Sequence, residues 1–191
     1  MIFLFSANTG AQNSLIDVNI YYAIPDAGGN DTFHTGKTAT LNYSYYPLSW
    51  LAMSAGIFFS EEIFDQTKTD IVGSYQSSIQ TRGMTIGIRP EYRLSKRNKI
   101  YFRGGFLLYD TRLTVSEFFE PGRPSGKSSA STQGNGYYLA FGWSHYFTDT
   151  VSFQLELASL SQQRLFADQT RSDNVFDLSF RGFSIGLAYG F

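Results

Sequence analysis

The last nine residues, FSIGLAYGF, alternate large apolar side chains with small ones, and this period of two recurs along most of the chain. In this stretch Phe183, Ile185 and Leu187 alternate with Ser184 and Gly186. Successive side chains of a β-strand point to opposite faces, so the pattern indicates strands with one apolar face and one small or polar face. A helical period is hard to find anywhere in the sequence. We therefore predict an all-β fold.

Eight segments carry this alternation. They are residues 14–24, 37–46, 50–60, 80–94, 99–113, 135–147, 151–163 and 174–191. YPLSW, SKRN and FTDT connect some of them as tight turns rich in Pro, Ser, Asn and Asp, whereas the other connections are long and polar. Short and long connections in alternation predict an antiparallel up-and-down meander with all its short turns at one end.

The composition decides which face of the strands meets water. Charged residues make up only 16% of the chain and aromatic residues 17%, whereas charged residues are about a quarter of a typical soluble domain. None of the lysines falls in the middle of a predicted strand; they are Lys37, Lys68, Lys96, Lys99 and Lys127. The small face of Gly, Ser, Thr and Ala suits the narrow interior of an eight-stranded barrel. The apolar face is therefore expected to meet lipid, and the first strand must pair with the last because hydrocarbon tolerates no open sheet edge.

Aromatic residues gather near the ends of the predicted strands, as they do at the two interfaces of a membrane. Near the short turns we expect a girdle of Tyr45, Trp50, Tyr92, Tyr101, Tyr146, Phe147, Tyr189 and Phe191. Near the long connections we expect a second girdle of Phe58, Phe59, Tyr137 and Phe180. The sequence thus predicts a transmembrane barrel.

Other features of the sequence exclude several function classes. A net charge of −1 gives no reason to expect nucleic acid as a partner. The absence of cysteine excludes disulfides, thiolate metal ligands and thiol catalysis. Residues 1–12 are apolar and then small and polar, which is typical of a signal-peptide remnant or an irregular tail. Residues 13–191 are assigned to one barrel domain.

A terminal motif links the chain to a known group of proteins. Ser184, Gly186, Tyr189 and Phe191 match the pattern polar-x-Gly-x-x-aromatic-x-aromatic at the C-terminus. With this motif, residues 13–191 resemble the small eight-stranded outer-membrane barrels of Gram-negative bacteria, of the OmpA, OmpX and OmpW type. The resemblance implies short periplasmic turns, long extracellular loops, contact with outer-membrane lipid and lipopolysaccharide, and recognition of the motif by the barrel-assembly machinery. It leaves the function open among anchoring, adhesion, surface protection, solute passage and lipid A modification.

Charged residues on the small face are predicted to meet inside the barrel. Arg89 and Arg103 lie similar distances above one short turn, and Glu156 lies slightly further above the next. Charges in a narrow lumen must be paired because burying them alone is costly. We predict a structural network of Arg89, Glu91, Arg103 and Glu156 that plugs the lumen, with Asp17 as a further candidate and Arg93 slightly below. The alternative is a gated polar pathway.

The sequence gives little support for an enzyme or a metal site. His145 follows Ser144, the pairing that a lipid A deacylase would suggest, but adjacent strand residues face opposite sides and cannot act as nucleophile and base. Divalent cations could bind transiently to carboxylates in the predicted loops, but these carboxylates have no defined ligand spacing. They are Glu61, Glu62, Asp65, Asp168 and Asp173. We expect no catalytic residue, cofactor or metal site. The expected role is structural or interactive through the long loops; the alternatives are a conduit for small hydrophobic solutes and a lipid-modifying enzyme.

Overall fold

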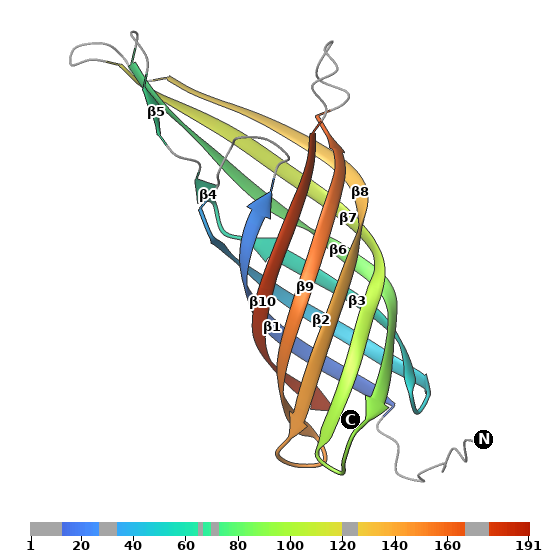
Figure 1. The fold of residues 1–191 in the computed structure, drawn as a ribbon. Helices are drawn as coiled ribbons and strands as arrows, with labels where there is room; N and C mark the ends of the chain where they lie inside the picture. Colours follow the sequence, from blue (N-terminus) through green and yellow to red (C-terminus); the bar gives the residue numbers. More distant parts are fainter. Residues whose placement is uncertain (1–12, 27–33, 65–66, 70–72, 120–125, 167–175) are drawn as a thin grey trace.

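The computed structural model describes residues 13–26, 34–64, 67–69, 73–119, 126–166 and 176–191. Eight long antiparallel strands form a closed ring (Figure 1). They are β1 (Ser14–Asp26), β2 (Gly36–Leu48), β3 (Leu51–Ser60), β6 (Gly73–Arg93), β7 (Asn98–Phe119), β8 (Gly126–Tyr146), β9 (Val151–Leu165) and β10 (Phe176–Gly190). Two short strands, β4 (Ile63–Phe64) and β5 (Lys68–Thr69), pair with the upper part of β6. Among the described residues there is no helix long and apolar enough to cross a bilayer.

The ring closes between the first and last strands. β1 pairs with β10 from Leu15↔Gly190 to Asp26↔Ser179, and every other long strand pairs with its neighbours in the sequence, β3 with β6 included. The three short turns lie at the same end as the start of β1 and the end of β10 (Figure 1). The predicted all-β, eight-stranded antiparallel up-and-down barrel is therefore confirmed. The predicted tail, residues 1–12, lies outside the described residues.

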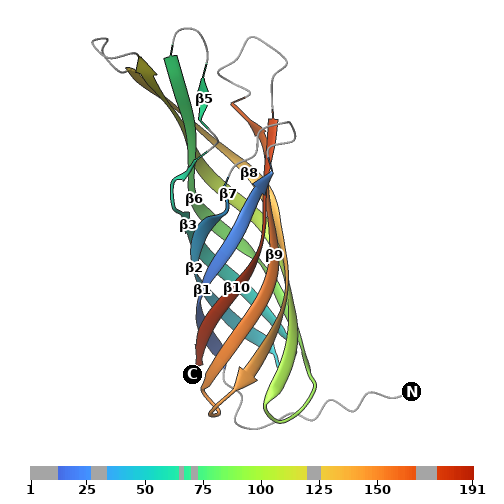
Figure 2. The same ribbon diagram turned by 60° about the vertical axis from the view of Figure 1, so that its left-hand side comes forward.

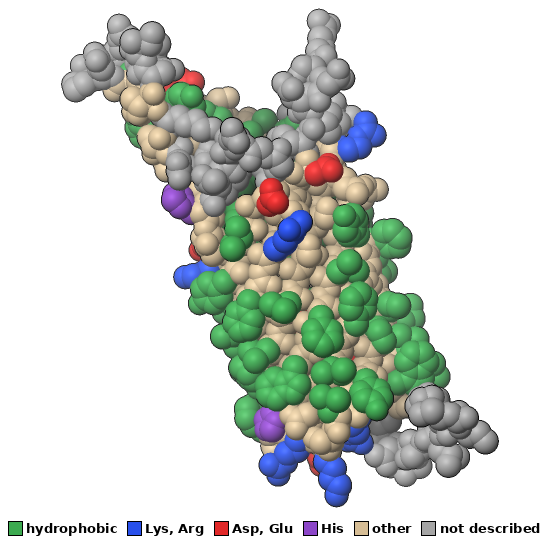
Figure 3. Space-filling view, in the orientation of Figure 1, with side chains coloured by type: hydrophobic (Ala, Val, Ile, Leu, Met, Phe, Trp, Pro, Cys, Tyr) green, Lys and Arg blue, Asp and Glu red, His purple; other side chains and the backbone are tan. Residues whose placement is uncertain are grey.

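The outer wall carries a broad band of exposed apolar side chains (Figure 3). Members from all around the ring include Val18, Leu41, Met53, Ile86, Phe106, Phe141, Leu157 and Leu187. This exposure is the reverse of a soluble domain, in which contiguous apolar surface of this extent is rare. The band is the surface expected to meet lipid.

Four aromatic residues predicted for the girdles lie inside the barrel instead. Tyr101 and Tyr146 are 2% and 8% exposed, and Phe58 and Phe180 are 1% and 3% exposed. Their neighbours along the strands face outward, as Phe59 does with 52% exposure. Strand alternation settles the side on which each ring lies, so position near a strand end was the wrong criterion.

Three strands extend much further than predicted. β8 parts from β9 above Gly136↔Gln162 but stays paired with β7 as far as Glu117↔Gly126, and β6 follows β7 to Gly73↔Phe119. These upper parts of β6, β7 and β8 form a ribbon that projects beyond the barrel (Figure 2). Most of the ribbon lies in stretches that the sequence predicts as loops. Outside lipid both faces of a strand can be polar, so the alternation that reveals a strand is lost.

Candidate functional site

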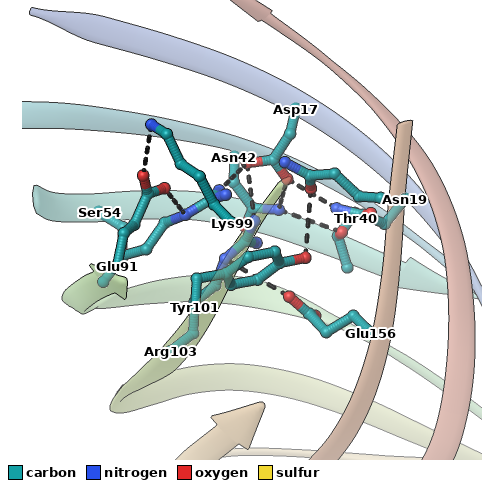
Figure 4. A network of polar contacts seen from close by, with 12 residues as sticks. Asp17, Asn19, Thr40, Asn42, Ser54, Glu91, Lys99, Tyr101, Arg103 and Glu156 are labelled. Atoms are coloured by element: carbon teal, nitrogen blue, oxygen red, sulfur yellow. Dashed lines mark hydrogen bonds and ion pairs between the residues drawn. The ribbon is translucent and has the colours of Figure 1, made fainter. Parts of the chain in front are cut away.

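The inward face of the turn-end half of the lumen carries a group of buried charged and polar side chains (Figure 4). Its members come from six strands of the ring: Asp17 and Asn19 from β1, Asn42 from β2, Ser54 from β3, Arg89 and Glu91 from β6, Lys99, Tyr101 and Arg103 from β7, and Glu156 from β9. In each strand the two flanking side chains face the outer wall, so alternation alone directs these groups inward. We call this group the lumen network.

Asp17 is the centre of the network. One carboxylate oxygen, Oδ2, lies 3.1 Å from Nη1 of Arg89 and 2.8 Å from Nη2 of Arg103. The other oxygen, Oδ1, accepts hydrogen bonds from Asn19 Nδ2 at 2.6 Å and Asn42 Nδ2 at 2.8 Å. The Asp17 side chain is fully buried. A single carboxylate therefore joins two arginines from neighbouring strands to β1 on the far side of the ring.

Two further carboxylates hold the outer sides of the arginines. Arg89 Nε lies 2.9 Å from Glu91 Oε1, and Glu91 Oε2 accepts from Lys99 Nζ at 2.9 Å. Arg103 Nε lies 3.6 Å from Glu156 Oε2. Each of these carboxylates also accepts a hydrogen bond from a tyrosine hydroxyl: Tyr46 donates to Glu91 and Tyr21 donates to Glu156.

The network is electrically balanced. Its ion pairs join three cations (Arg89, Lys99 and Arg103) with three anions (Asp17, Glu91 and Glu156). Isolated charges at such depth would be very costly, whereas a closed set of pairs with hydrogen bonds to the remaining oxygens is tolerable. This arrangement fills the lumen without a net charge.

Tyr101 occupies the space beside the two arginines. Its ring centroid lies 4.0 Å from the guanidinium carbon of Arg89 and 5.4 Å from that of Arg103. A Cβ on Gly142, the β8 residue opposite Tyr101, would collide with this ring. The glycine on the small face therefore leaves room for an aromatic side chain from the next strand.

The structure brings together all four residues predicted for the network. Arg89, Glu91, Arg103 and Glu156 are each at most 9% exposed. The two arginines meet through Asp17, which the sequence offered only as a further candidate. Arg93 lies outside the network and is exposed. Asp17 had a signal in the sequence, because it lies between apolar Ile16 and Val18 in an alternating strand. Both neighbours face outward, which directs Asp17 inward.

The loop-end half of the lumen is filled differently. Buried apolar side chains from β1, β3, β4 and β6–β10 pack there in one cluster: Ala23, Phe58, Ile63, Ile79, Leu107, Tyr109, Tyr138, Leu160, Leu165, Phe166, Leu178 and Phe180. At the end of β9 Arg164 and Phe166 adopt positive φ angles of 55° and 59°. Side chains do not alternate through this bend, so consecutive Leu165 and Phe166 are both buried. Tyr109 holds the bend by donating to the Gln163 carbonyl at 2.7 Å. We call this group the apolar plug.

The residues of the predicted assembly motif lie on both faces of β10 and just beyond its end. Ser184 and Gly186 face the lumen, while Tyr189 and Phe191 are 54% and 55% exposed on the outer wall with their ring centroids 6.2 Å apart. A Cβ on Gly186 would collide with the side-chain oxygen of Asn19 in the lumen network. Recognition of the motif by assembly machinery stays a prediction.

Ser144 and His145 lie on opposite sides of β8. Ser144 is 1% exposed inside the lumen. The His145 ring lies on the outer wall, 5.7 Å from the ring of Trp143 and 5.5 Å from that of Phe147, with Nδ1 3.0 Å from Asn98 Oδ1. The two side chains cannot work as nucleophile and base in this arrangement.

The carboxylates considered for cations are apart from the network. Glu61 accepts from the Lys37 backbone N–H at 2.8 Å, and Glu62 accepts from the Ser78 hydroxyl at 2.5 Å. Asp65, Asp168 and Asp173 lie outside the described residues. Within the described ranges no three His, Asp or Glu side chains group as metal ligands would.

Comparisons with known proteins agree with this geometry. The sequence matches the family model of the outer membrane protein beta-barrel domain over residues 1–191. A search of curated protein sequences gives no match. Among solved structures the chain is similar to neisserial surface protein A (NspA) from Neisseria, at 13% identity and a TM-score of 0.63, covering 95% of this chain and 99% of that one.

Two further structures have the same fold. Ail, the attachment invasion locus protein of Yersinia pestis, is 12% identical with a TM-score of 0.56, and the match covers 93% of this chain and 97% of Ail. OprG from Pseudomonas aeruginosa is 11% identical with a TM-score of 0.54, and the match covers 94% of this chain and 96% of OprG. At these identities the likeness concerns the fold alone.

Proposed function

Because this chain belongs to the outer membrane protein beta-barrel family and resides in the bacterial outer membrane, we propose that it is a plugged barrel that acts through its extracellular segments. Its role would be adhesion, surface protection or partner binding, without catalysis. The single observation that carries the proposal is the filling of the lumen at two levels. The lumen network occupies the periplasmic half, and the apolar plug occupies the extracellular half.

The network supports a closed lumen through its connections across the ring. Asp17 on β1 and Arg103 on β7 come from strands on opposite sides of an eight-stranded ring, yet their side chains lie 2.8 Å apart. Tyr101 and Gln154 add a further link, with the tyrosine hydroxyl 3.3 Å from the amide oxygen. An ion crossing this layer would have to displace paired charges, which is costly in a narrow interior.

The ribbon supports an interactive role. It extends the sheet beyond the apolar band and includes Phe118, which is 52% exposed at the far end of β7. Above Gly136 the described part of β9 offers β8 no partner strand. Segments that a rigid barrel holds away from the membrane are typical carriers of binding function.

The test of the closed lumen is conductance in planar bilayers. We expect refolded protein to give no steady single-channel current, and clear conductance with the wild-type chain would contradict the proposal. A variant with both Arg103→Ala and Tyr101→Ala opens the periplasmic half only, so it tests whether the apolar plug alone keeps the barrel closed. A difference in electrophoretic mobility between unheated and heated samples checks that every variant has folded.

The test of the interactive role shortens the ribbon. Joining Val115 to Ser128 through a two-residue Asn-Gly turn removes the tip while keeping a cross-strand pair that already exists. Bacteria that display the shortened chain should lose adhesion to cultured epithelial cells relative to the full chain at equal surface amount. Unchanged adhesion, or no adhesion by either chain, would contradict a role for the ribbon in attachment.

A second candidate function is passage of small hydrophobic solutes, and one observation favours it. A narrow apolar cavity lies in the extracellular half, with Tyr21, Ala23, Phe58, Leu160 and Phe180 among its lining residues. Uptake of a small hydrophobic solute into vesicles would separate the candidates. Faster uptake with the protein than without it, abolished by Ala23→Phe in the cavity wall, would favour passage over the plugged barrel.

A further inference from the structure

The periplasmic end of the barrel concentrates its positive charge in one turn. β6 ends at Arg93, and its connection to β7 carries Lys96 and Arg97; all three side chains are exposed. The other two short connections, YPLSW and FTDT, contain no Lys or Arg. Figure 3 shows Lys and Arg side chains below the apolar band at this end of the molecule. We call residues 93–97 the basic turn.

The cations of the basic turn have no anionic partner among the described residues. None of the ion pairs in that part of the chain involves them, and the nearest carboxylate along β6, Glu91, is already held by Arg89 and Lys99. Three like charges within five residues repel one another unless an anion lies between them. The basic turn therefore presents three cations that form no ion pair with a described residue. The other two short connections contain one carboxylate side chain, Asp149.

The backbone of the basic turn is well held, so the cations are presented from a fixed platform. Ser95 Oγ accepts from the backbone N–H groups of Arg97 and Asn98 at 3.3 and 3.1 Å and from Asn98 Nδ2 at 2.9 Å. The Leu94 N–H donates to the Asn98 carbonyl at 2.9 Å. Ordering such a turn before a ligand arrives lowers the entropy cost of binding.

Apolar and aromatic side chains surround the basic turn on the outer wall. Tyr92 and Leu94 flank Arg93 in the sequence and are 64% and 55% exposed. On the other side Asn98 pairs with His145, whose ring lies between those of Trp143 and Phe147. Aromatic rings with a polar edge prefer the headgroup level of a membrane, so these rings indicate that the basic turn lies near that level.

We propose that the basic turn binds the phosphate headgroup of anionic phospholipid in the periplasmic leaflet of the outer membrane. A lipid offers both features that the site displays, a negative headgroup for the cations and acyl chains for Tyr92, Leu94 and Phe147. Residues 1–12 of the chain contain no Asp or Glu and cannot supply the anion from their side chains. This site lies at the opposite end of the barrel from the ribbon and is independent of the role proposed for it.

The test uses tryptophan fluorescence, because the chain has only two tryptophans. In the full chain Trp50→Phe leaves Trp143 of β8, which pairs with Ile100 near the start of β7, close to the basic turn. Protein folded into phosphatidylcholine vesicles is compared with protein in vesicles that also contain phosphatidylglycerol, with one or the other lipid brominated on its acyl chains. Each cation near an anionic surface should enrich phosphatidylglycerol over phosphatidylcholine beside the basic turn on the order of fivefold. We expect Trp143 to be quenched several-fold more strongly by brominated phosphatidylglycerol than by brominated phosphatidylcholine, and less so at high salt.

The decisive variant combines Arg93→Gln, Lys96→Gln and Arg97→Gln and should remove the preference. Lys127→Gln, which removes an exposed cation at the extracellular end, is the matched control and should keep it. The three single substitutions should each reduce it in part, which keeps the test usable if the triple variant folds poorly. Equal quenching by both lipids in the parent, or an unchanged preference in the folded triple variant, would overturn the proposal.

Other occupants of the basic turn give other outcomes. A lipid preference that arises only after removal of residues 1–12 would mean that this segment covers the turn, and the proposal would be wrong for the full chain. Equal quenching together with charge-dependent co-sedimentation on purified peptidoglycan would identify the cell wall as the partner and would also overturn it.

Discussion

In the periplasmic half of the lumen Asp17 pairs with two arginines, whereas in the extracellular half Leu107 packs among aliphatic and aromatic side chains. Both halves fill the same narrow ring of strands. Paired charges depend on every partner being present, because the loss of one leaves another buried and unpaired. Apolar packing depends on volume and tolerates a change of shape if the volume is kept. The two halves should therefore respond differently to substitution.

The largest effect is expected when the centre of the network is removed. Asp17→Ala leaves Arg89 and Arg103 without their shared carboxylate, and breaking a buried pair costs about 3–5 kcal/mol. Urea unfolding in lipid vesicles, followed by tryptophan fluorescence, measures the loss in the free energy of unfolding. Asp110→Ala is the control, because it breaks the Arg82–Asp110 pair on the outer wall, where the side chains are 68% and 29% exposed. Such a pair contributes less than about 1 kcal/mol.

Equal losses from Asp17→Ala and Asp110→Ala would remove the distinction between the two kinds of pair. The temperature at which heating changes the electrophoretic mobility of the barrel gives a second measure. If this temperature is the same for Arg103→Ala as for the wild type, the result would argue against the network.

The apolar plug should show a smaller effect that depends on volume. Leu107 is fully buried, and Leu107→Ala is expected to cost about 3 kcal/mol through the lost contacts and the cavity left behind. Leu107→Met keeps the volume and should cost less than about 1.5 kcal/mol. The same urea titration measures both. If Leu107→Met lowers the free energy of unfolding as much as Leu107→Ala does, the apolar plug does not tolerate a change of shape at constant volume. The two halves of the lumen would then not differ in the way proposed.

The smallest of the three effects tests how tightly the network is packed. Gly142→Ala places a methyl group against Tyr101, which is held beside two arginines, so overpacking should cost about 1–3 kcal/mol. Gly104→Ala is the control, because its added Cβ would lie 3.0 Å from the Phe102 ring on the outer wall, where the ring can move into lipid. A thermal shift in detergent that is larger for Gly104→Ala than for Gly142→Ala would contradict a rigid network.

Much of the barrel followed from the sequence because lipid imposes a simple rule on each strand. In the membrane every second side chain must be apolar, so the strand count, the faces and the inward position of Arg89 and Glu156 could all be predicted. The ribbon could not, because water on both faces of β7 and β8 beyond the apolar band removes the alternation that marks a strand. The same lack of a rule hid Leu165 and Phe166, which are both buried only because the backbone bends at the end of β9.

The partners within the lumen were harder to predict than its members. Alternation gives the side on which a residue lies but not which residue it meets across the ring, since that depends on strand tilt and register. The sequence therefore predicts Asp17 only as a further candidate, although alternation in its own strand places it on the inward face. The prediction for Phe58 and Phe180 is wrong for a different reason, because an aromatic residue near a strand end can face either lipid or lumen and only the alternation of its strand decides which.

The shared carboxylate of Asp17 also has a consequence for the order of folding. Asp17 belongs to the first strand of the ring and Arg103 to a strand from the middle of the chain, and β1 finds its second neighbour only when β10 arrives. Until that late pairing forms, Asp17 is not held opposite Arg103, and the two arginines lack their shared carboxylate. The stabilisation from the two Asp17 pairs is thus gained at closure, because contacts between residues far apart in the sequence require the loop between them to close first. The Arg89–Glu91 pair within β6 and the Glu91–Lys99 pair between β6 and β7 do not depend on that step.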